Sequence, residues 1–173
     1  YKGNIPNLGE DIFIAPGSKL IGDIYVGDNS SIWYNCVLRG DVNYIRVGNK
    51  TNIQDGTIIH VSSSGFSATG GEGTPTIIGN NVTIGHNATV HACQIQDYSL
   101  IGMGSVILDG VIIEEMAFIA AGAIIPPRKL VKKDELWAGN PGRFIRKINE
   151  KEKMLIVNTP DVYSKLREEF LKK

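Results

Sequence analysis

The sequence is poor in cysteine and histidine and carries no excess charge of either sign. Its two cysteines, Cys36 and Cys93, lie far apart and form no CxxC pair, which excludes a disulfide framework and a cysteine zinc site. We interpret both as small thiols in the core. Lys plus Arg and Asp plus Glu number 18 each, so the charge balance gives no reason to expect nucleic acid or an anionic membrane surface as a partner.

The chain also lacks a long apolar segment and a targeting pattern. No run approaches the roughly 18 apolar residues of a membrane span. The first residues, Tyr1 to Asn4, show no signal-peptide pattern, so we expect a cytoplasmic protein that does not bind a membrane. At 173 residues and 42% hydrophobic content, the chain suits one domain with a sizeable core.

A six-residue repeat is the strongest pattern that the sequence does contain. The residue four positions after each aliphatic anchor is usually small or β-branched, as in Ser18, Ala88 and Ala123, and Gln94 is the clearest exception. A small residue at that place indicates a tight interior corner. The spacing between anchors is interrupted by one slip, one long insertion and one deletion. The anchors are Ile14, Leu20, Val26, Ile32, Leu38, Val47, Ile53, Ile59, Ile78, Ile84, Val90, Ile95, Ile101, Ile107, Ile113, Ile119 and Ile125.

Short strands of this kind, three per coil, form a parallel β-helix of triangular cross-section. We predict about five to six coils over residues 1–127, because the repeat ends at Pro126-Pro127. Residues 61–76 are predicted to be an inserted loop. Residues 128–173 are predicted to be a connector and C-terminal helices that pack on the β-helix, so that the whole chain is one structural domain.

The C-terminal part of the chain has a helical pattern. After a short helical segment over residues 149–157, we expect the main helix to begin with Thr159 as its N-cap and Pro160 at its first position. Apolar residues then recur every four positions from Val162 onwards. This apolar stripe predicts a helix that packs along one side of the β-helix.

When the anchors are assigned in threes, they fall on three faces. Arg39, His60 and His91 each directly follow a face-two anchor in three consecutive coils, so we expect them to stack as a column with neighbours about 4.8 Å apart. Side chains next to an inward anchor point outward. Two imidazoles one rung apart can therefore converge on one zinc ion, with bonds of about 2.0–2.1 Å. Face one contains Ile14, Ile32, Ile53, Ile84, Ile101 and Ile119; face two contains Leu20, Leu38, Ile59, Val90, Ile107 and Ile125; face three contains Val26, Val47, Ile78, Ile95 and Ile113.

The third histidine, His86, follows a face-one anchor by two positions and lies around the corner from this column. We expect it to reach the metal only from a neighbouring subunit of a homotrimer, in which face one of one chain packs on face two of the next. A single histidine in a turn is usually just a polar outward residue, but all three histidines fall at this seam. Gln54 and Asp55 occupy the corresponding face-one positions one coil below His86.

The polar residues around the seam have alternative interpretations. Arg39 and Asp41 could form a structural ion pair, or Arg39 could pair with Asp55 across the seam and fix the subunits. Buried ion pairs of this kind fix the alignment of two surfaces more reliably than they add net stability. Gln54 is either an amide that stabilises a turn or a group that orients solvent at the metal.

Three segments of the chain resemble the γ-class carbonic anhydrase family. They are IWYNCVLRGD over residues 32–41, NIQDG over residues 52–56, and the stretch that holds His86 and His91. The resemblance covers about residues 10–170 and extends to hexapeptide-repeat proteins with a left-handed β-helix. Only this resemblance implies the left hand, because parallel crossovers are otherwise right-handed in most proteins.

The resemblance implies a homotrimer with zinc, or alternatively iron(II) or cobalt(II), at each subunit interface. His60 and His91 would come from one chain and His86 from the next. A three-histidine zinc site with an open position lowers the pKa of water towards about 7, which implies reversible hydration of carbon dioxide to bicarbonate. In relatives a C-terminal tyrosine can approach the metal, so Tyr163 has either this role or one in helix packing. The surrounding polar positions that match the family are Arg39, Asp41, Asn52, Gln54 and Asp55.

The chain departs from the best-known members of this family at the acidic positions that export protons. Val42 stands where those proteins have a glutamate after the Arg-Gly-Asp, and the 61–76 loop contains a single acid, Glu72. The resemblance is therefore to a short branch that lacks the acidic loop. Glu72 can carry protons only if the loop folds back over the seam.

Two other classes of function stay open. A hexapeptide acyltransferase, or a related enzyme of coenzyme A thioesters, uses a histidine at a trimer seam as general base and needs no metal, so three clustered histidines argue against it. The other class is a non-catalytic, metal-binding trimeric scaffold. Metal content separates the acyltransferase from the rest, and a carbon dioxide hydration assay separates an enzyme from a scaffold.

Overall fold

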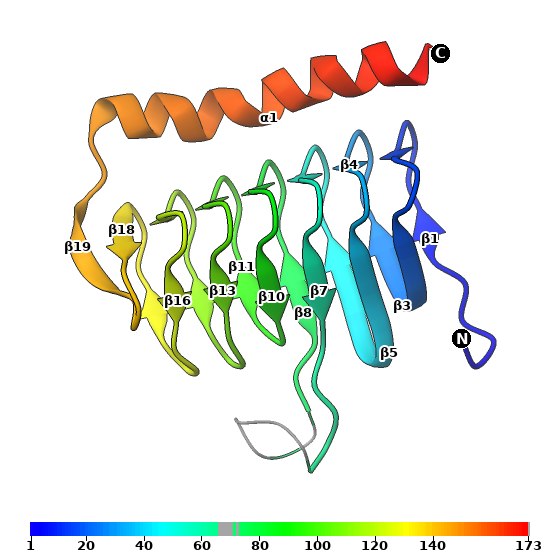
Figure 1. The fold of residues 1–173 in the computed structure, drawn as a ribbon, viewed down its shortest axis with the longest axis horizontal. Helices are drawn as coiled ribbons and strands as arrows, with labels where there is room; N and C mark the ends of the chain where they lie inside the picture. The colour runs from blue at the N-terminus through cyan, green and yellow to red at the C-terminus, as the bar shows by residue number, and fades with distance from the viewer. Residues whose placement is uncertain (66–70, 72, 173) are drawn as a thin grey trace.

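The computed structural model describes residues 1–65, 71 and 73–172. Short parallel strands stack into a left-handed β-helix, and one long helix, α1 (Glu150–Leu171), lies along its side (Figure 1). The aliphatic anchors point into the core, and small residues let the chain turn at the corners between faces. The predicted fold class is confirmed.

The strand ladders follow the three predicted faces. Face one is the stack of β2 (Phe13–Ile14), β4 (Ser31–Ile32), β6 (Asn52–Ile53), β9 (Thr83–Ile84), β12 (Leu100–Ile101), β15 (Phe118–Ile119) and β18 (Glu135–Ala138). Face two contains β7 (Ile58–His60), β10 (Thr89–His91), β13 (Val106–Ile107) and β16 (Ile124–Ile125). Face three contains β1 (Asn7–Leu8), β8 (Thr76–Ile78), β11 (Gln94–Ile95), β14 (Ile112–Ile113) and β17 (Leu130–Val131). Two longer strands, β3 (Lys19–Val26) and β5 (Val37–Val47), run from face two into face three.

The registers of these ladders match the anchor assignment. On face two, Leu38 lies opposite Ile59, and Ile59 lies opposite Val90, with all three side chains fully buried. Ile14, the first anchor of face one, differs because it is 36% exposed. It belongs to the first strand of the face-one ladder, which β4 covers on one side only. Its neighbour Phe13 is buried instead, in an aromatic cluster under α1.

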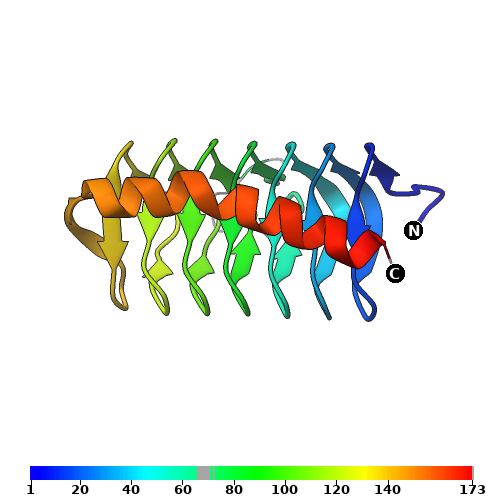
Figure 2. The same cartoon turned by 90° about the horizontal axis from the view of Figure 1, so that it is seen from above.

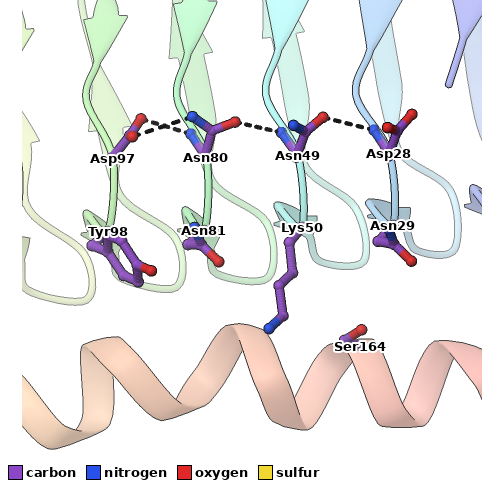
Figure 3. Close-up of a pocket in the computed structure, with 9 residues that line it drawn as sticks. All are labelled: Asp28, Asn29, Asn49, Lys50, Asn80, Asn81, Asp97, Tyr98 and Ser164. Atoms are coloured by element: carbon purple, nitrogen blue, oxygen red, sulfur yellow. Dashed lines mark hydrogen bonds between the residues drawn. The ribbon is translucent and has the colours of Figure 1, made fainter. Parts of the chain in front are cut away.

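A ladder of Asp and Asn side chains holds the corner between faces three and one. The backbone N–H of Asp28 donates to Asn49 Oδ1, and that of Asn49 donates to Asn80 Oδ1, both at 2.8 Å (Figure 3). The backbone N–H of Asn80 continues the ladder to Asp97 Oδ1, also at 2.8 Å. The residues that follow these positions all adopt the left-handed conformation, which asparagine tolerates more readily than most residues; they are Asn29, Lys50, Asn81 and Tyr98. The ladder therefore fixes the register of successive coils at this corner.

The β-helix extends further than the predicted end at residue 127. β17 pairs with β14 and β18 pairs with β15, which places Val131 and Trp137 in the ladders of faces three and one. Both residues continue the six-residue spacing from Ile125, although Pro126-Pro127, which directly follow Ile125, disguise it. The chain then turns back into β19 (Arg143–Lys147), which pairs antiparallel with β18 and leads to α1.

α1 is one continuous helix, and the predicted start at Thr159 is wrong. Its N-cap is Asn149, whose side chain accepts from the backbone N–H of Glu152 at 3.0 Å, while the Glu152 carboxylate accepts from the backbone N–H of Asn149 at 2.8 Å. Pro160 lies inside the helix and is buried. A proline removes one helical hydrogen bond, but packing of the helix on the β-helix outweighs this local cost.

α1 lies over face one along the length of the β-helix (Figure 2). It contacts β2, β4, β6 and β9, all of which belong to that face. Aromatic rings anchor its C-terminal half, with Trp33 edge-on to Tyr163 at 5.4 Å and Phe13 against Phe170 at 5.4 Å between centroids. Of the helical segments that the structure describes, none has the length and apolarity that crossing a membrane requires.

Candidate metal centre

His60 and His91 lie next to each other in the predicted column on face two. His60 ends β7 and is opposite Arg39 of β5 on one side and His91 of β10 on the other. The Nδ1 atom of His60 is 3.2 Å from the Nε2 atom of His91, and the ring centroids are 5.2 Å apart. Both side chains are partly exposed, so the pair can be reached from outside the chain.

Each imidazole of this pair also contacts a carboxylate. The Nε2 atom of His60 is 2.9 Å from Asp41 Oδ1, and the Nδ1 atom of His91 is 2.5 Å from Asp109 Oδ1. Sequence reasoning identified Asp41 but missed Asp109. A signal was present, because Asp109 follows the next face-two anchor, Ile107, by two positions.

The two carboxylates determine which ring nitrogens carry protons. An ionised carboxylate can only accept hydrogen bonds, so a neutral imidazole beside it must donate its single N–H. This assigns the proton of neutral His60 to Nε2 and that of neutral His91 to Nδ1. The lone pairs that remain, on His60 Nδ1 and His91 Nε2, face each other across 3.2 Å. Two lone pairs in this position repel, so the arrangement is complete only with a proton or a cation between them.

The gap between these nitrogens suits a zinc ion. Two nitrogens that each lie about 2.0–2.1 Å from one tetrahedral zinc are about 3.3 Å apart, and the observed separation is 3.2 Å. A carboxylate on the far ring nitrogen is the usual companion of a zinc-binding histidine. Within the described residues of one chain, no group of three or more His, Cys, Asp or Glu side chains is placed to hold an ion together.

The surroundings of the pair set its charge. Burial is the main cause that lowers the pKa of His60, and the hydrogen bond to Asp41 opposes it. Burial alone would raise the pKa of Asp41, but the hydrogen bonds from His60 and Arg39 outweigh it, so this pKa is lowered. Neutral His60 and ionised Asp41 are the states that a metal ligand and its carboxylate partner require. Arg39 forms an ion pair with Asp41, which is the structural pairing considered from the sequence.

His86 lies on the corner between faces one and two, two residues after the end of β9. Its Nδ1 atom is 2.8 Å from Asp55 Oδ2, and its side chain is 38% exposed. Within the chain Asp55 therefore pairs with His86, while Arg39 pairs with Asp41. All three histidines thus have a carboxylate partner, and Asp55 on Nδ1 leaves the Nε2 atom of His86 free to bind a metal.

The predicted contact between face one of one subunit and face two of the next needs a correction. α1 covers β2, β4, β6 and β9 of face one, so this face is already occupied within the chain. The corner that carries His86 and Asp55 remains partly exposed beside the helix. The helical periodicity indicated an apolar stripe, but it did not indicate which face the stripe would cover.

Gln54 and Asn52 lie on face one beneath α1. The Nε2 group of Gln54 donates to Asn52 Oδ1 at 3.1 Å, and the Nδ2 group of Asn52 donates to Thr83 Oγ1 at 2.9 Å, with all three residues buried. Gln54 and Thr83 border a cavity of about 370 Å³ between face one and α1. Its lining includes Gln54, Thr83, His86, Leu100, Met103, Phe118 and Tyr163.

Tyr163 both packs the helix and lines this cavity. Its ring meets Trp33 at an interplanar angle of 79°, as part of the aromatic cluster under α1. Burial and, to a lesser extent, the negative charge of Asp55 raise the pKa of Tyr163. Its hydroxyl therefore stays protonated at neutral pH, and both Tyr163 and His86 line this cavity.

Glu72, which could carry protons only if the 61–76 loop folds back over the seam, lies outside the described residues. Val42, at the position considered above for a glutamate, is exposed next to Asp41. Among the described residues, the carboxylates in contact with the histidine pair are those of Asp41 and Asp109.

A larger cavity, about 680 Å³ in volume, lies between the Asp and Asn ladder and α1 (Figure 3). Its lining is polar and contains no histidine. Lys50, which extends towards the helix in this view, pairs with Asp161 of α1. We assign this cavity to the docking of the helix, because its charged groups already have partners.

The fold and the site together define a hexapeptide-repeat β-helix protein that carries on its outer surface two adjacent histidines, each in contact with a carboxylate. A family model described as dynactin subunit 5 matches residues 14–171. The chain is 47% identical to γ carbonic anhydrase 1 from mitochondria of Arabidopsis thaliana over 161 residues, which are 93% of this chain and 58% of that protein. The chain belongs to the γ-class carbonic anhydrase family.

Two further comparisons cover nearly the whole of both proteins. A probable carbonic anhydrase of Methanocaldococcus jannaschii is 41% identical over 161 residues, which are 93% of this chain and 96% of that protein. A solved structure of a hexapeptide transferase family protein from Anaplasma phagocytophilum has a TM-score of 0.89 at 40% identity, and covers 98% of this chain and 95% of that one. The chain spans a little under three fifths, 58%, of the Arabidopsis relative.

Proposed function

We propose that the protein is a zinc-dependent carbonic anhydrase of the γ class that acts as a homotrimer. The observation that carries the proposal is the pair of facing lone pairs on His60 Nδ1 and His91 Nε2, 3.2 Å apart and each fixed by a carboxylate. Such a pair supplies two ligands to one ion. His86 of a neighbouring copy supplies the third, because its Nε2 atom is free and its corner is exposed.

The exposed corner, and not the flat surface of face one, would meet face two of the next subunit. α1 occupies the flat surface, and the corner presents His86 with Asp55. Rotational symmetry would then repeat the same contact three times and give one site per chain.

The residues around the site hold the ligands and receive the substrate. Asp41, itself paired with Arg39, orients His60. Asp55 orients His86 in the same way. Zinc held by three histidines supplies hydroxide near neutral pH, because it lowers the pKa of water towards about 7. Carbon dioxide is apolar, and the cavity beside His86 has apolar walls with the amide of Gln54, fixed by Asn52, at its edge.

The metal and the assembly are tested together. Protein purified without chelator should contain about one zinc ion per chain and have the mass of a trimer. Imidazole ligands also suit iron(II) and cobalt(II), so the analysis should include both metals. His86→Ala should lower the metal content and the initial rate of carbon dioxide hydration in stopped flow, while Gln94→Ala, on the exposed side of face three, should change neither. A metal-free trimer, or full hydration activity in His86→Ala, would contradict the proposal.

A second candidate function is acyl transfer, and the His86–Asp55 pair favours it. An exposed histidine held by a carboxylate at 2.8 Å has the geometry of a general base and its orienting group. The similar structure from Anaplasma phagocytophilum is described as a hexapeptide transferase family protein. Acetyl transfer from acetyl-coenzyme A by metal-free protein would support this candidate, and hydration activity that depends on zinc would exclude it. Trimers that bind zinc without hydration activity would indicate a scaffold.

The cellular location and the absence of nucleic-acid and membrane partners stay predictions. The name of the Arabidopsis relative places that protein in mitochondria, and cytoplasmic location of this chain rests on the sequence argument alone.

A further inference from the structure

Asp109 is a buried carboxylate next to the histidine pair that sequence reasoning did not identify. It lies one coil beyond His91, after β13, and is 8% exposed. Its Oδ1 atom is 2.5 Å from the Nδ1 atom of His91. Its backbone carbonyl accepts from the N–H of Arg128 at 2.9 Å, so the coil ladder holds the residue in place.

Asp109 differs from Asp41 in the partners of its charge. Asp41 is shared between His60 and the cation of Arg39. Among the ion pairs of the described residues, Asp109 has His91 as its partner. A buried carboxylate without a neighbouring cation needs the hydrogen bond that it accepts to offset the free-energy cost of burying its charge. The contact with His91 Nδ1–H is therefore more strongly constrained than the contact between Asp41 and His60.

We propose that Asp109 is a positioning residue that fixes His91 in the tautomer with the proton on Nδ1. Its effect is to leave a lone pair on Nε2 and to aim that lone pair at the space beside His60 Nδ1. The inference rests on the proposed function in one respect, which is that His91 Nε2 is a metal ligand. The assignment of the tautomer itself follows from the contact with Asp109.

The alternative tautomer would close the site. A proton on His91 Nε2 would point at His60 Nδ1, 3.2 Å away, and form an N–H···N hydrogen bond between the two rings. Neither nitrogen of that hydrogen bond would then be available to a metal. Asp109 therefore favours the tautomer in which both facing nitrogens can bind a metal over the tautomer in which the two rings are hydrogen-bonded to each other.

The test uses the full chain and two measurements. ¹⁵N NMR of metal-free protein reports which nitrogen of each histidine carries the proton, and competition with a chelator reports the affinity for zinc. In the unaltered protein, His91 should carry its proton on Nδ1. Asp109→Asn keeps the shape of the side chain but can donate to Nδ1, so His91 should shift towards the Nε2–H tautomer, and the affinity for zinc should fall by about 10–100-fold.

Asp23→Asn is the matched control, because Asp23 is a partly exposed aspartate on β3 whose carboxylate pairs with Arg46 and with no histidine among the ion pairs of the described residues. It should leave both measurements unchanged. A proton on Nε2 of His91 in the unaltered protein would overturn the inference, as would an Asp109→Asn variant with unchanged tautomer and unchanged affinity. The NMR measurement on the unaltered protein needs no variant, so it decides the question even if Asp109→Asn does not fold. If the unaltered protein binds no zinc, the proposed function fails while the NMR measurement still tests the tautomer.

Discussion

Co-expression of two inactive variants tests which ligands come from different chains. His60→Ala removes one member of the histidine pair, and His86→Ala removes the ligand on the corner. Each variant alone should form trimers without a complete site. In a mixed trimer, a site is complete wherever a chain with an intact pair meets a neighbour with an intact His86.

The expected recovery follows from the geometry of the seam. When equal amounts of the two variants assemble at random, the chain that supplies the pair is intact at half of the interfaces. The neighbour that supplies His86 is intact at half of those, so about one quarter of the sites are restored. Zinc bound per chain and the initial rate of carbon dioxide hydration should both reach about one quarter of the values for the unaltered protein.

The control is a mixture of the two variants purified separately and kept under conditions in which the subunits do not exchange. It should show no recovery. The reasoning is refuted if mixed trimers form but neither zinc binding nor hydration returns. It is also refuted if His86→Ala alone binds zinc as tightly as the unaltered protein, because the ligands would then come from one chain.

Further predictions concern the fold. Ile84→Ala should lower the free energy of unfolding by about 2–5 kcal/mol, because its side chain is fully buried. Ile14→Ala in the same ladder should lower it by about 1 kcal/mol or less, because Ile14 is 36% exposed. Urea unfolding should separate the two variants, and equal losses of stability would contradict the assigned coil order. Asn149→Ala removes the N-cap of α1 and should cost about 1 kcal/mol, seen as a lower thermal midpoint, unless the helix begins elsewhere. The hydrogen bond from Arg146 lowers the pKa of Glu152 from 4.5 to about 2. The contribution of Glu152 to stability is therefore present above pH 4.5 and is lost as the pH falls towards 2. Glu152→Gln should reduce the loss of unfolding free energy over this pH range, and an unchanged loss would contradict the pairing.

The coils and the histidine column could be predicted because every coil obeys the same local rule. An inward anchor, an outward neighbour and a small corner residue recur together, so counting from anchors places His60 beside His91 without knowledge of distant contacts. The same counting would have placed Val131 and Trp137 in the ladders, had Pro126-Pro127 not been taken as the end.

Features that depend on contacts between distant segments could not be predicted in this way. Thr159 followed by Pro160 is a good local start signal for a helix, but the cap at Asn149 and packing against face one extend α1 through it. Asp109 was missed because the column argument considered residues directly after an anchor, while Asp109 reaches His91 from the second position of the next coil.

A crystal structure of zinc-loaded protein, with diffraction recorded at the zinc absorption edge, tests the shared site most directly. The account predicts an anomalous peak between His60 Nδ1 and His91 Nε2 of one chain, with His86 Nε2 of a neighbouring chain as the third ligand. A peak elsewhere, or zinc between the two histidines with the neighbour's His86 turned away from it, would contradict the account.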